Sequence, residues 1–160
     1  MIPEFSKDTL EIISLIEAWE DKLKGLSTEV IIERRNIQNR TIKQILGHLI
    51  DSASNNTHRI IHLQYRESPM SFPNYALEGN NDRWIAIQNY QEENWENLIL
   101  LWKYLNIHLV HVIQNVPFEK LGNEWIASSE QNVSLKEMVH YYLNHLELHL
   151  SEIEELIEMQ

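Results

Sequence analysis

The sequence predicts an all-α protein, a four-helix bundle that occupies residues 1–160 as a single domain. Glycine and proline, which end regular elements, occur only four times each in 160 residues, and hydrophobic residues make up 43%. Apolar residues also recur with helical period in four long segments, each able to bury one face. A chain of this length is large enough for one hydrophobic core, so four amphipathic helices packed as a bundle are expected.

The first helix is expected over residues 8–24. Asp8 and Glu11 have the spacing of a capping box, and Gly25 ends the segment. The second begins at Thr41, whose capping-box partner is Gln44, and keeps helical period to about residue 65. Its apolar face is formed by Ile42, Ile45, Leu46, Leu49, Ile50, Ala53, Ile60 and Ile61.

Residues 66–83 carry two prolines, one glycine and three asparagines, which predicts a long loop. A connection of about 18 residues is long for neighbouring helices in a bundle. We therefore expect a crossover between the second and third helices, which would pass over the end of the bundle or cover a site.

The third helix is expected over residues 84–115, before Pro117, and would place three tryptophans in the core: Trp84, Trp95 and Trp102. The fourth begins at Ser134, whose capping-box partner is Glu137. Its apolar face is formed by Leu135, Met138, Val139, Tyr142, Leu146, Leu150, Ile153 and Ile157.

The charge and composition exclude several kinds of partner. A net charge of −11 argues against nucleic acid and anionic membrane surfaces, because both require a basic footprint. The chain has no cysteine, so it has no disulfide and no thiolate ligand of its own. No apolar run approaches the roughly 18 residues of a membrane span, and the first residues lack the pattern of a signal peptide. We expect a cytoplasmic protein.

Three of the eight histidines suggest a metal site. His145 and His149 lie one helical turn apart in the fourth helix, with His149 on the apolar face and His145 at its edge. His48 lies at the border of the apolar face of the second helix. Three imidazoles can hold a divalent cation such as zinc, nickel, iron or copper and leave a coordination position open for a substrate or water.

Spacing alone does not establish that site. His58 and His62 have the same i, i+4 spacing, although the neighbouring Arg59 and a position further from the apolar face favour a solvated pair. A single histidine on a helix is usually a surface or core-edge residue. A metal site and an arrangement of ordinary histidines therefore both remain open from the residues alone.

Polar residues near the three histidines would orient them by hydrogen bonds: Asp51, Asn55, Glu147 and Glu152. For Glu147 and Glu152 a solvated acidic helix face is the competing interpretation. The segment at 145–149 is not the His-Glu-x-x-His motif of metalloproteases. A phosphate-binding glycine loop, a Gly-x-Ser-x-Gly elbow and the paired Glu-x-x-His motifs of di-iron bundles are also absent from the sequence.

The sequence resembles the DinB-like superfamily of helical-bundle metalloenzymes. The resemblance rests on TIKQILGHLIDSA at 41–53, on the pair at 145 and 149, on Tyr90 and Trp102, and on the loop at 72–75. It implies an up-down-down-up bundle. It also implies a divalent metal, zinc or nickel above all, held by the residues that match the family's histidines, His48, His145 and His149.

Members of this superfamily include S-transferases and isomerases that use low-molecular-weight thiols such as bacillithiol or mycothiol. The resemblance thus implies a metal-dependent enzyme, a thiol S-transferase that activates a low-molecular-weight thiol for a small-molecule substrate. Phe72 and Tyr75 of the crossover would then help to form the substrate pocket. The alternative is a non-catalytic ligand-binding or dimerising bundle whose metal site is structural or vestigial, and in either case a homodimer is a possible assembly.

Overall fold

The computed structural model describes residues 3–77 and 79–159. Four long helices make up its body, with two short helices, three 3-10 turns and one β-hairpin between them. The long helices are α1 (Ser6–Lys24), α3 (Ile42–Tyr65), α5 (Trp95–Gln114) and α6 (Leu135–Glu158). The short elements are η1 (Pro3–Phe5), α2 (Thr28–Glu33), α4 (Asn80–Gln88), η2 (Tyr90–Glu92), η3 (Phe118–Lys120), β1 (Glu124–Ser128) and β2 (Gln131–Ser134).

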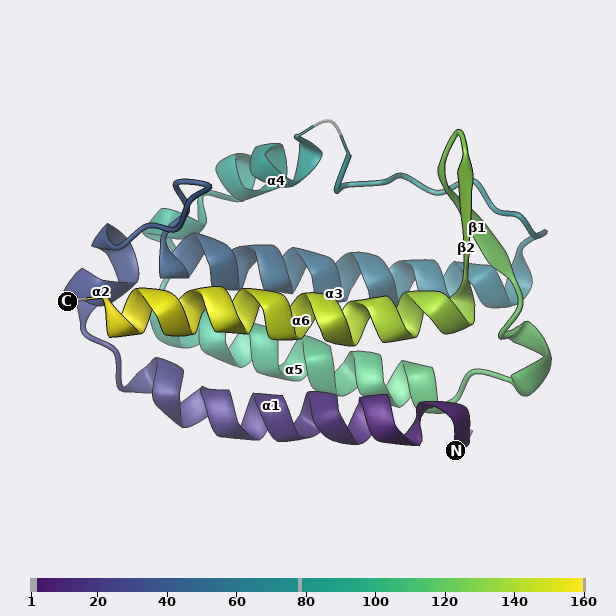
Figure 1. Ribbon diagram of the computed structural model, residues 1–160, viewed down its shortest axis with the longest axis horizontal. Helices are drawn as coiled ribbons and strands as arrows, with labels where there is room; N and C mark the ends of the chain where they lie inside the picture. The colour runs from purple at the N-terminus through teal and green to yellow at the C-terminus, as the bar shows by residue number, and fades with distance from the viewer. Residues whose placement is uncertain (1–2, 78, 160) are drawn as a thin grey trace.

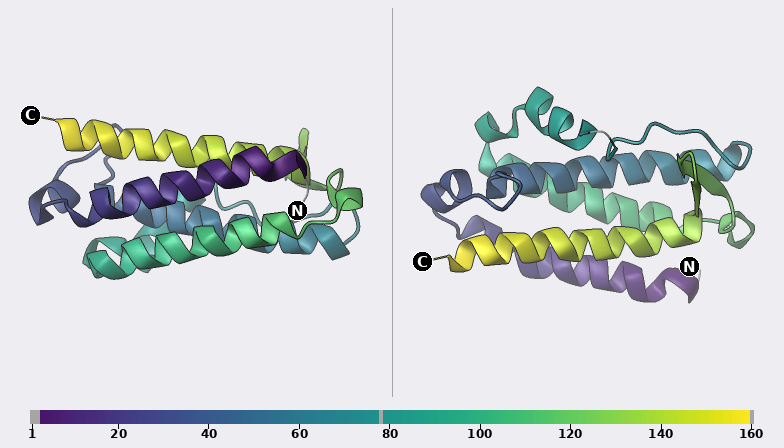
Figure 2. Two further views of the ribbon diagram at one scale, coloured as in Figure 1. Left: turned by 90° about the horizontal axis from the view of Figure 1, so that it is seen from below. Right: turned by 45° about the horizontal axis from the view of Figure 1, so that its top comes forward.

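The long helices form a bundle in which α3 and α1 each pack against both α5 and α6. Figure 1 shows α1 and α6 running in one direction and α3 and α5 running in the other. The view from below in Figure 2 shows α1 between α6 and α5. The apolar faces of all four helices meet in one core, which includes the fully buried Trp102. None of the helices in the described part of the chain is long and apolar enough to cross a membrane.

Two capping boxes predicted from the sequence are present, at the starts of α3 and α6. In each, the hydroxyl of the first residue accepts a hydrogen bond from the backbone N–H of the fourth, and the side chain of the fourth accepts one from the backbone N–H of the first. The pairs are Thr41 with Gln44, and Ser134 with Glu137. The box predicted at Asp8 is wrong. Because η1 runs directly into α1, that helix begins at Ser6, and Asp8 lies in its first turn.

The predicted third helix over residues 84–115 is also wrong in part, because the segment is divided. Asn89 adopts the left-handed conformation with φ of 49°, which asparagine tolerates better than most residues, and this ends α4. Asn94 then starts α5 by accepting the N–H of Asn97. The tryptophans therefore do not share one helix, and they are not all in the core. Trp84 on α4 is 39% exposed, whereas Trp102 on α5 is buried.

The crossover from α3 to α5 covers one side of the bundle. These two helices are neighbours that run in the same direction, so the chain must return along the length of α3, about 36 Å for 24 residues. Residues 66–94 make that return, with α4 and η2 packed against α3 (Figures 1 and 2). The crossover therefore forms a wall over α3.

The hairpin of β1 and β2, which the sequence analysis did not anticipate, closes one end of that wall. Trp125 pairs with Val133 in the antiparallel register. Met70 of the crossover bonds to both sides of Trp125, through its N–H to Glu124 at 2.8 Å and through its carbonyl to Ile126 at 2.9 Å. These bonds fix the crossover to the hairpin beside the ends of α3 and α6 (Figure 1).

Candidate metal centre

Three histidine side chains from two helices converge between α3 and α6. His48 Nε2 lies 3.1 Å from His145 Nε2, which lies 3.1 Å from His149 Nε2. One ring nitrogen from each of the three lies within 4.8 Å of the other two. His48 and His149 are 3% and 6% exposed. The structure thus brings together the three histidines that the sequence analysis selected.

Local packing explains the position of His48. At Gly47, the preceding residue, an added Cβ would lie 2.2 Å from the ring of Tyr90. Glycine therefore lets η2 of the crossover approach α3 closely, next to His48. The Tyr90 hydroxyl then donates to Asp51 Oδ1 at 2.7 Å, which joins the crossover to α3 one turn further on.

Burial keeps two of the imidazoles neutral. Desolvation, with repulsion from His145 and His149, lowers the pKa of His48 to about 2. Desolvation, with repulsion from His149, lowers the pKa of His145 to about 4. Both rings are therefore uncharged at pH 7 and have a lone pair available, which is the state that a metal ligand requires.

The donor set fits a divalent transition metal. Metal–nitrogen bonds of about 2.0–2.1 Å place two ligand nitrogens about 3.3 Å apart in a tetrahedral site and about 2.9 Å apart in an octahedral one. The two 3.1 Å separations observed here lie between these values. Nothing but a shared cation or shared protons makes three neutral imidazole nitrogens favourable neighbours at such distances.

Two of the three rings have partners on their outer nitrogens. His149 Nδ1 lies 2.9 Å from Glu152 Oε2, and Asn36 donates to the same carboxylate oxygen at 3.2 Å. His145 Nδ1 lies 3.4 Å from the Ser52 hydroxyl. Because a carboxylate only accepts, the bond to Glu152 places the proton of His149 on Nδ1 and leaves its Nε2 free to bind a metal. Asn36 lies far from α6 in sequence and carried no signal that could have found it.

Asp51 and Asn55, expected to orient the histidines, are hydrogen-bonded to other groups. Asp51 Oδ1 accepts hydrogen bonds from Tyr90 and from Gln88, both at 2.7 Å, and burial raises the pKa of this carboxyl group. Asn55 donates to the Asp51 carbonyl at 2.9 Å. Within residues 3–77 and 79–159, neither side chain is hydrogen-bonded to a histidine. The Asp51 carboxylate thus holds the crossover on α3, whereas the Asn55 amide bonds within α3 itself.

His58 and His62, the other pair with i, i+4 spacing, do not converge with a third histidine in the described part of the chain. His58 is exposed, and His62 lies among aromatic rings, 5.5 Å from the ring of Phe72. In the described part of the chain, the three converging histidines are the group with suitable geometry for a metal. The neighbouring Arg59, used from the sequence as a sign that this pair is solvated, is itself buried at 6% exposure.

A cavity of about 260 Å³ opens beside His145. Tyr75 of the crossover lines it, and its ring lies 6.0 Å from that of His48. Phe72 does not line the cavity but lies behind it, near Arg59 and His62. The remaining lining residues are Ser52, Asn56, Arg59, Asn74, Ala76, Trp125, Val133, Met138, Tyr141, Tyr142 and His145.

The part of the cavity wall that is formed by the hairpin and by Arg59 was not predicted from the sequence. Arg59 follows His48 by 11 residues, or about three helical turns, so it lies on the same face of α3. That spacing could have indicated Arg59 as a residue of the site. The contact between Arg59 and Trp125 depends on the hairpin, and no sequence signal indicated it.

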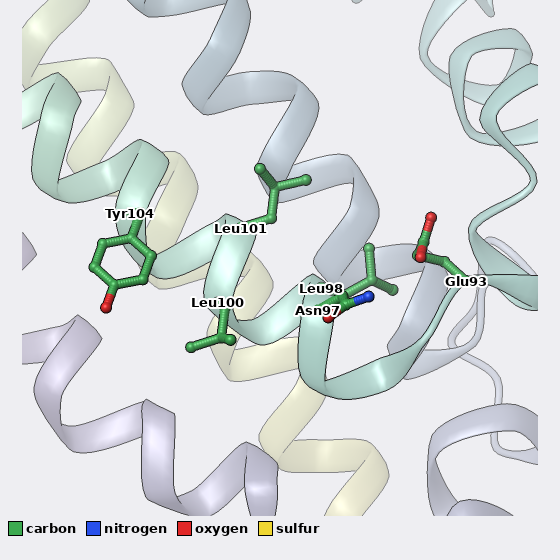
Figure 3. A pocket seen from close by; sticks show the side chains of 6 residues that line it. All are labelled: Glu93, Asn97, Leu98, Leu100, Leu101 and Tyr104. Carbon is green, nitrogen blue, oxygen red and sulfur yellow. The ribbon is translucent and has the colours of Figure 1, made fainter.

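A second cavity, of about 390 Å³, lies on the outer surface of the bundle (Figure 3). It is lined by α5 residues from Asn97 to Tyr104 and by Glu93 just before them, with leucine side chains between. No histidine and only one carboxylate reaches it. It is not part of the histidine site.

The fold and site together define a class of protein: a helical bundle with three histidines on two adjacent helices beside a cavity. A family model for the DinB superfamily matches residues 14–153. The chain belongs to the DinB superfamily, and the resemblance found in the sequence is confirmed. No functionally curated protein matches the sequence.

Solved structures agree with this assignment. The fold is similar to that of YfiT from Bacillus subtilis, with a TM-score of 0.80 and 15% identity over 98% of this chain and 87% of that one. YfiT is described as a probable metal-dependent hydrolase with an unusual four-helix bundle topology. The fold is also similar to the mycothiol-dependent maleylpyruvate isomerase, with a TM-score of 0.73 and 14% identity over 92% of this chain. A mutant of that isomerase matches equally well, and this chain spans 60% of the isomerase's length.

Proposed function

We propose that this protein is a divalent-metal-dependent enzyme, a thiol S-transferase in which His48, His145 and His149 hold zinc or nickel. The observation that carries the proposal is the convergence of three imidazole nitrogens, from the buried His48 and His149 and the half-buried His145, at the edge of a cavity. The mycothiol-dependent relative in fold supports the choice of a low-molecular-weight thiol as the co-substrate.

The donor set itself favours an anionic ligand in the open position, and a thiolate is such a ligand. Three neutral imidazoles do not offset the charge of a divalent cation, and no carboxylate of residues 3–77 or 79–159 belongs to the cluster. A thiol that entered the open position would be bound by the metal and would lose its proton near neutral pH, which supplies a thiolate nucleophile. Glu152 and Ser52 would keep two of the rings oriented toward that position.

Tyr75 would act on the substrate as a hydrogen-bond donor. Burial raises the pKa of its hydroxyl to about 12, so the group keeps its proton at neutral pH. Its position in the cavity wall near His48 lets it face a bound molecule. The proposed pocket therefore has a metal-bound thiolate at one side and a neutral donor at the other.

Cobalt provides a direct test. The protein is loaded with Co²⁺ and titrated with glutathione, with cysteine and with bacillithiol. We expect at least one thiol to produce the intense near-ultraviolet absorption of a sulfur-to-cobalt bond in the wild type and not in His149→Ala. Absence of that absorption with every thiol, in protein that binds cobalt, would overturn the thiol chemistry and leave a structural metal.

A dimerising bundle is the second candidate function, and the exposed apolar surface of α5 favours it. Leu100, Leu101 and Tyr104 are 40%, 46% and 61% exposed on this surface, around the cavity of Figure 3. A second copy of the chain would cover these residues. Light scattering should then give the mass of two chains for the wild type and of one for Leu101→Glu. A wild-type monomer at high concentration would exclude the dimer.

A further inference from the structure

Arg59 is a buried cation without an anionic partner among the residues that the structure describes. Its side chain is 6% exposed, and its one hydrogen-bond contact among the described residues is from Nη1 to the Met138 sulfur at 3.8 Å, a weak acceptor. Its Nε has no partner there. Burial lowers the pKa of the guanidinium to about 10, so the group is still charged at pH 7. Buried charges normally have a hydrogen-bonded counter-ion, so this exception requires an explanation.

Aromatic stacking holds the guanidinium in place but leaves its donors free. The guanidinium carbon lies 3.7 Å from the centre of the Trp125 ring and 5.5 Å from that of Phe72. Cation–π contacts use the flat face of the group and partly offset its desolvation. The N–H donors lie in the plane of the guanidinium and point outward from its edge. Stacking therefore orients the guanidinium but leaves its N–H donors without hydrogen-bond acceptors.

The free donors belong to the wall of the histidine cavity. Arg59 and His145 line the same space of about 260 Å³, and neither Asp nor Glu is among its lining residues. This is unusual in a chain with a net charge of −11. Asn56 and Asn74 place amide groups in the same wall, and Tyr141, which is 52% exposed, lies at its outer edge. The cavity thus combines a fixed cation with neutral polar groups beside the proposed metal position.

We propose that Arg59 is the specificity residue of this cavity and binds the oxyanion, a carboxylate or a phosphate, of a small-molecule substrate. The guanidinium fork matches two oxygens of either group. The rest of the substrate would extend along α3 toward the histidines, which would place its reacting end beside the proposed metal position. The placement of the reacting end rests on the proposed function, whereas oxyanion binding at Arg59 requires no metal.

Binding of simple anions to chelator-treated protein tests this assignment. The probes are benzoate, phenyl phosphate and the neutral isostere benzamide, measured by calorimetry. We expect one of the anions to bind at least about tenfold more tightly than benzamide, because a charged bidentate pair is formed only with the anion. Tighter binding of benzoate identifies a carboxylate substrate, and tighter binding of phenyl phosphate identifies a phosphate. Equal binding of all three would overturn the proposal.

Three variants assign the effect to Arg59. Arg59→Met keeps the length of the side chain and should lose the preference for the anion entirely. Arg59→Lys keeps the charge but not the fork, and should weaken anion binding by about tenfold. Arg66→Met is the matched control, since Arg66 is exposed at the end of α3 and should leave binding unchanged. Unchanged binding in Arg59→Met, or equal losses in Arg66→Met, would contradict the assignment.

A measurement on the wild type keeps the test independent of how the variants fold. Because Arg59 Nε is buried without a partner, its N–H resonance should be protected from exchange and visible by nitrogen-15 NMR. Saturable movement of that resonance on adding the anion is the expected result, and an unmoved resonance at saturation would overturn the proposal. Metal content and zinc uptake are measured on the same preparation before chelator treatment, so a protein that binds anions but neither carries nor takes up metal refutes the proposed enzyme and retains the Arg59 site.

Discussion

At the scale of single residues, convergence in the fold rather than sequence spacing distinguishes the candidate metal-binding histidines. The pair at 145 and 149 shares its i, i+4 spacing with His58 and His62, so the sequence alone left both possible. In the fold, His48 and His149 are buried and His58 is exposed. A pattern of apolar residues can indicate the buried face of a helix, but it cannot show which buried rings of two helices will meet.

The carboxylate behind His149 should tune metal affinity. Glu152 accepts a hydrogen bond from His149 Nδ1 at 2.9 Å and so fixes the orientation of that ring. Removing such a partner typically costs about 10- to 100-fold in affinity. We expect Glu152→Ala to weaken zinc binding by that factor in a competition with a chromophoric chelator.

The matched control for that experiment is Glu147→Ala on the same helix. Glu147 is exposed, and the described residues give it no contact with the cluster. Its substitution should leave zinc affinity unchanged, and equal losses in the two variants would show that general charge, not orientation, is responsible.

The stability of the metal-free protein should depend on pH through His48 and His145. Their folded-state pKa values, about 2 and about 4, lie below the ordinary value of 6.5. Between pH 6.5 and 4 the unfolded chain therefore binds more protons than the folded one, so stability falls as pH falls. The unfolding free energy in chelator should be constant above about pH 7 and decline toward pH 4, by less in His48→Asn.

At the scale of elements, capping and periodicity predicted the starts of α3 and α6 correctly, whereas the same signals placed the start of α1 two residues late. The starts of α3 and α6 were predicted from their capping boxes, because this signal is local. The division of residues 84–115 was missed because it depends on Asn89 taking a left-handed conformation between two helix-compatible segments. The hairpin was missed because Trp125 is held by Met70, more than 50 residues earlier.

The contact between η2 and α3 should be sensitive to one methyl group. A Cβ at Gly47 would meet the ring of Tyr90 at 2.2 Å, too close for any relaxed contact. Gly47→Ala should therefore displace η2, break the bond between Tyr90 and Asp51, and lower the unfolding free energy by about 1–3 kcal/mol. Urea unfolding measures this.

Gly122→Ala is the control for that substitution, because nothing lies within 4 Å of a Cβ built there. It should leave the urea midpoint essentially unchanged. A Gly47→Ala protein as stable as this control would mean that the crossover is not fixed on α3 in the way described.

At the scale of the whole molecule, the crossover explains why the site has its shape. Because α3 and α5 are parallel neighbours, 29 residues must return along α3, and they bring Tyr75 and Tyr90 to the same side as the histidines. The acidic surface expected from the net charge of −11 does not extend into the cavity, whose lining holds Arg59 and no acid. The composition predicted which classes of partner are excluded, and only the fold showed that one cavity of this acidic protein is lined by a cation.

The central claim is that His48, His145 and His149 hold a divalent metal, and the metal content of untagged protein tests it most directly. Elemental analysis of wild type purified without chelator should give about one equivalent of zinc or nickel per chain, and His149→Ala should give almost none. His58→Ala, which alters an exposed histidine with the same sequence spacing, should retain the wild-type content. Equal metal in wild type and His149→Ala, or a metal-free wild type that does not take up added zinc, would contradict the account.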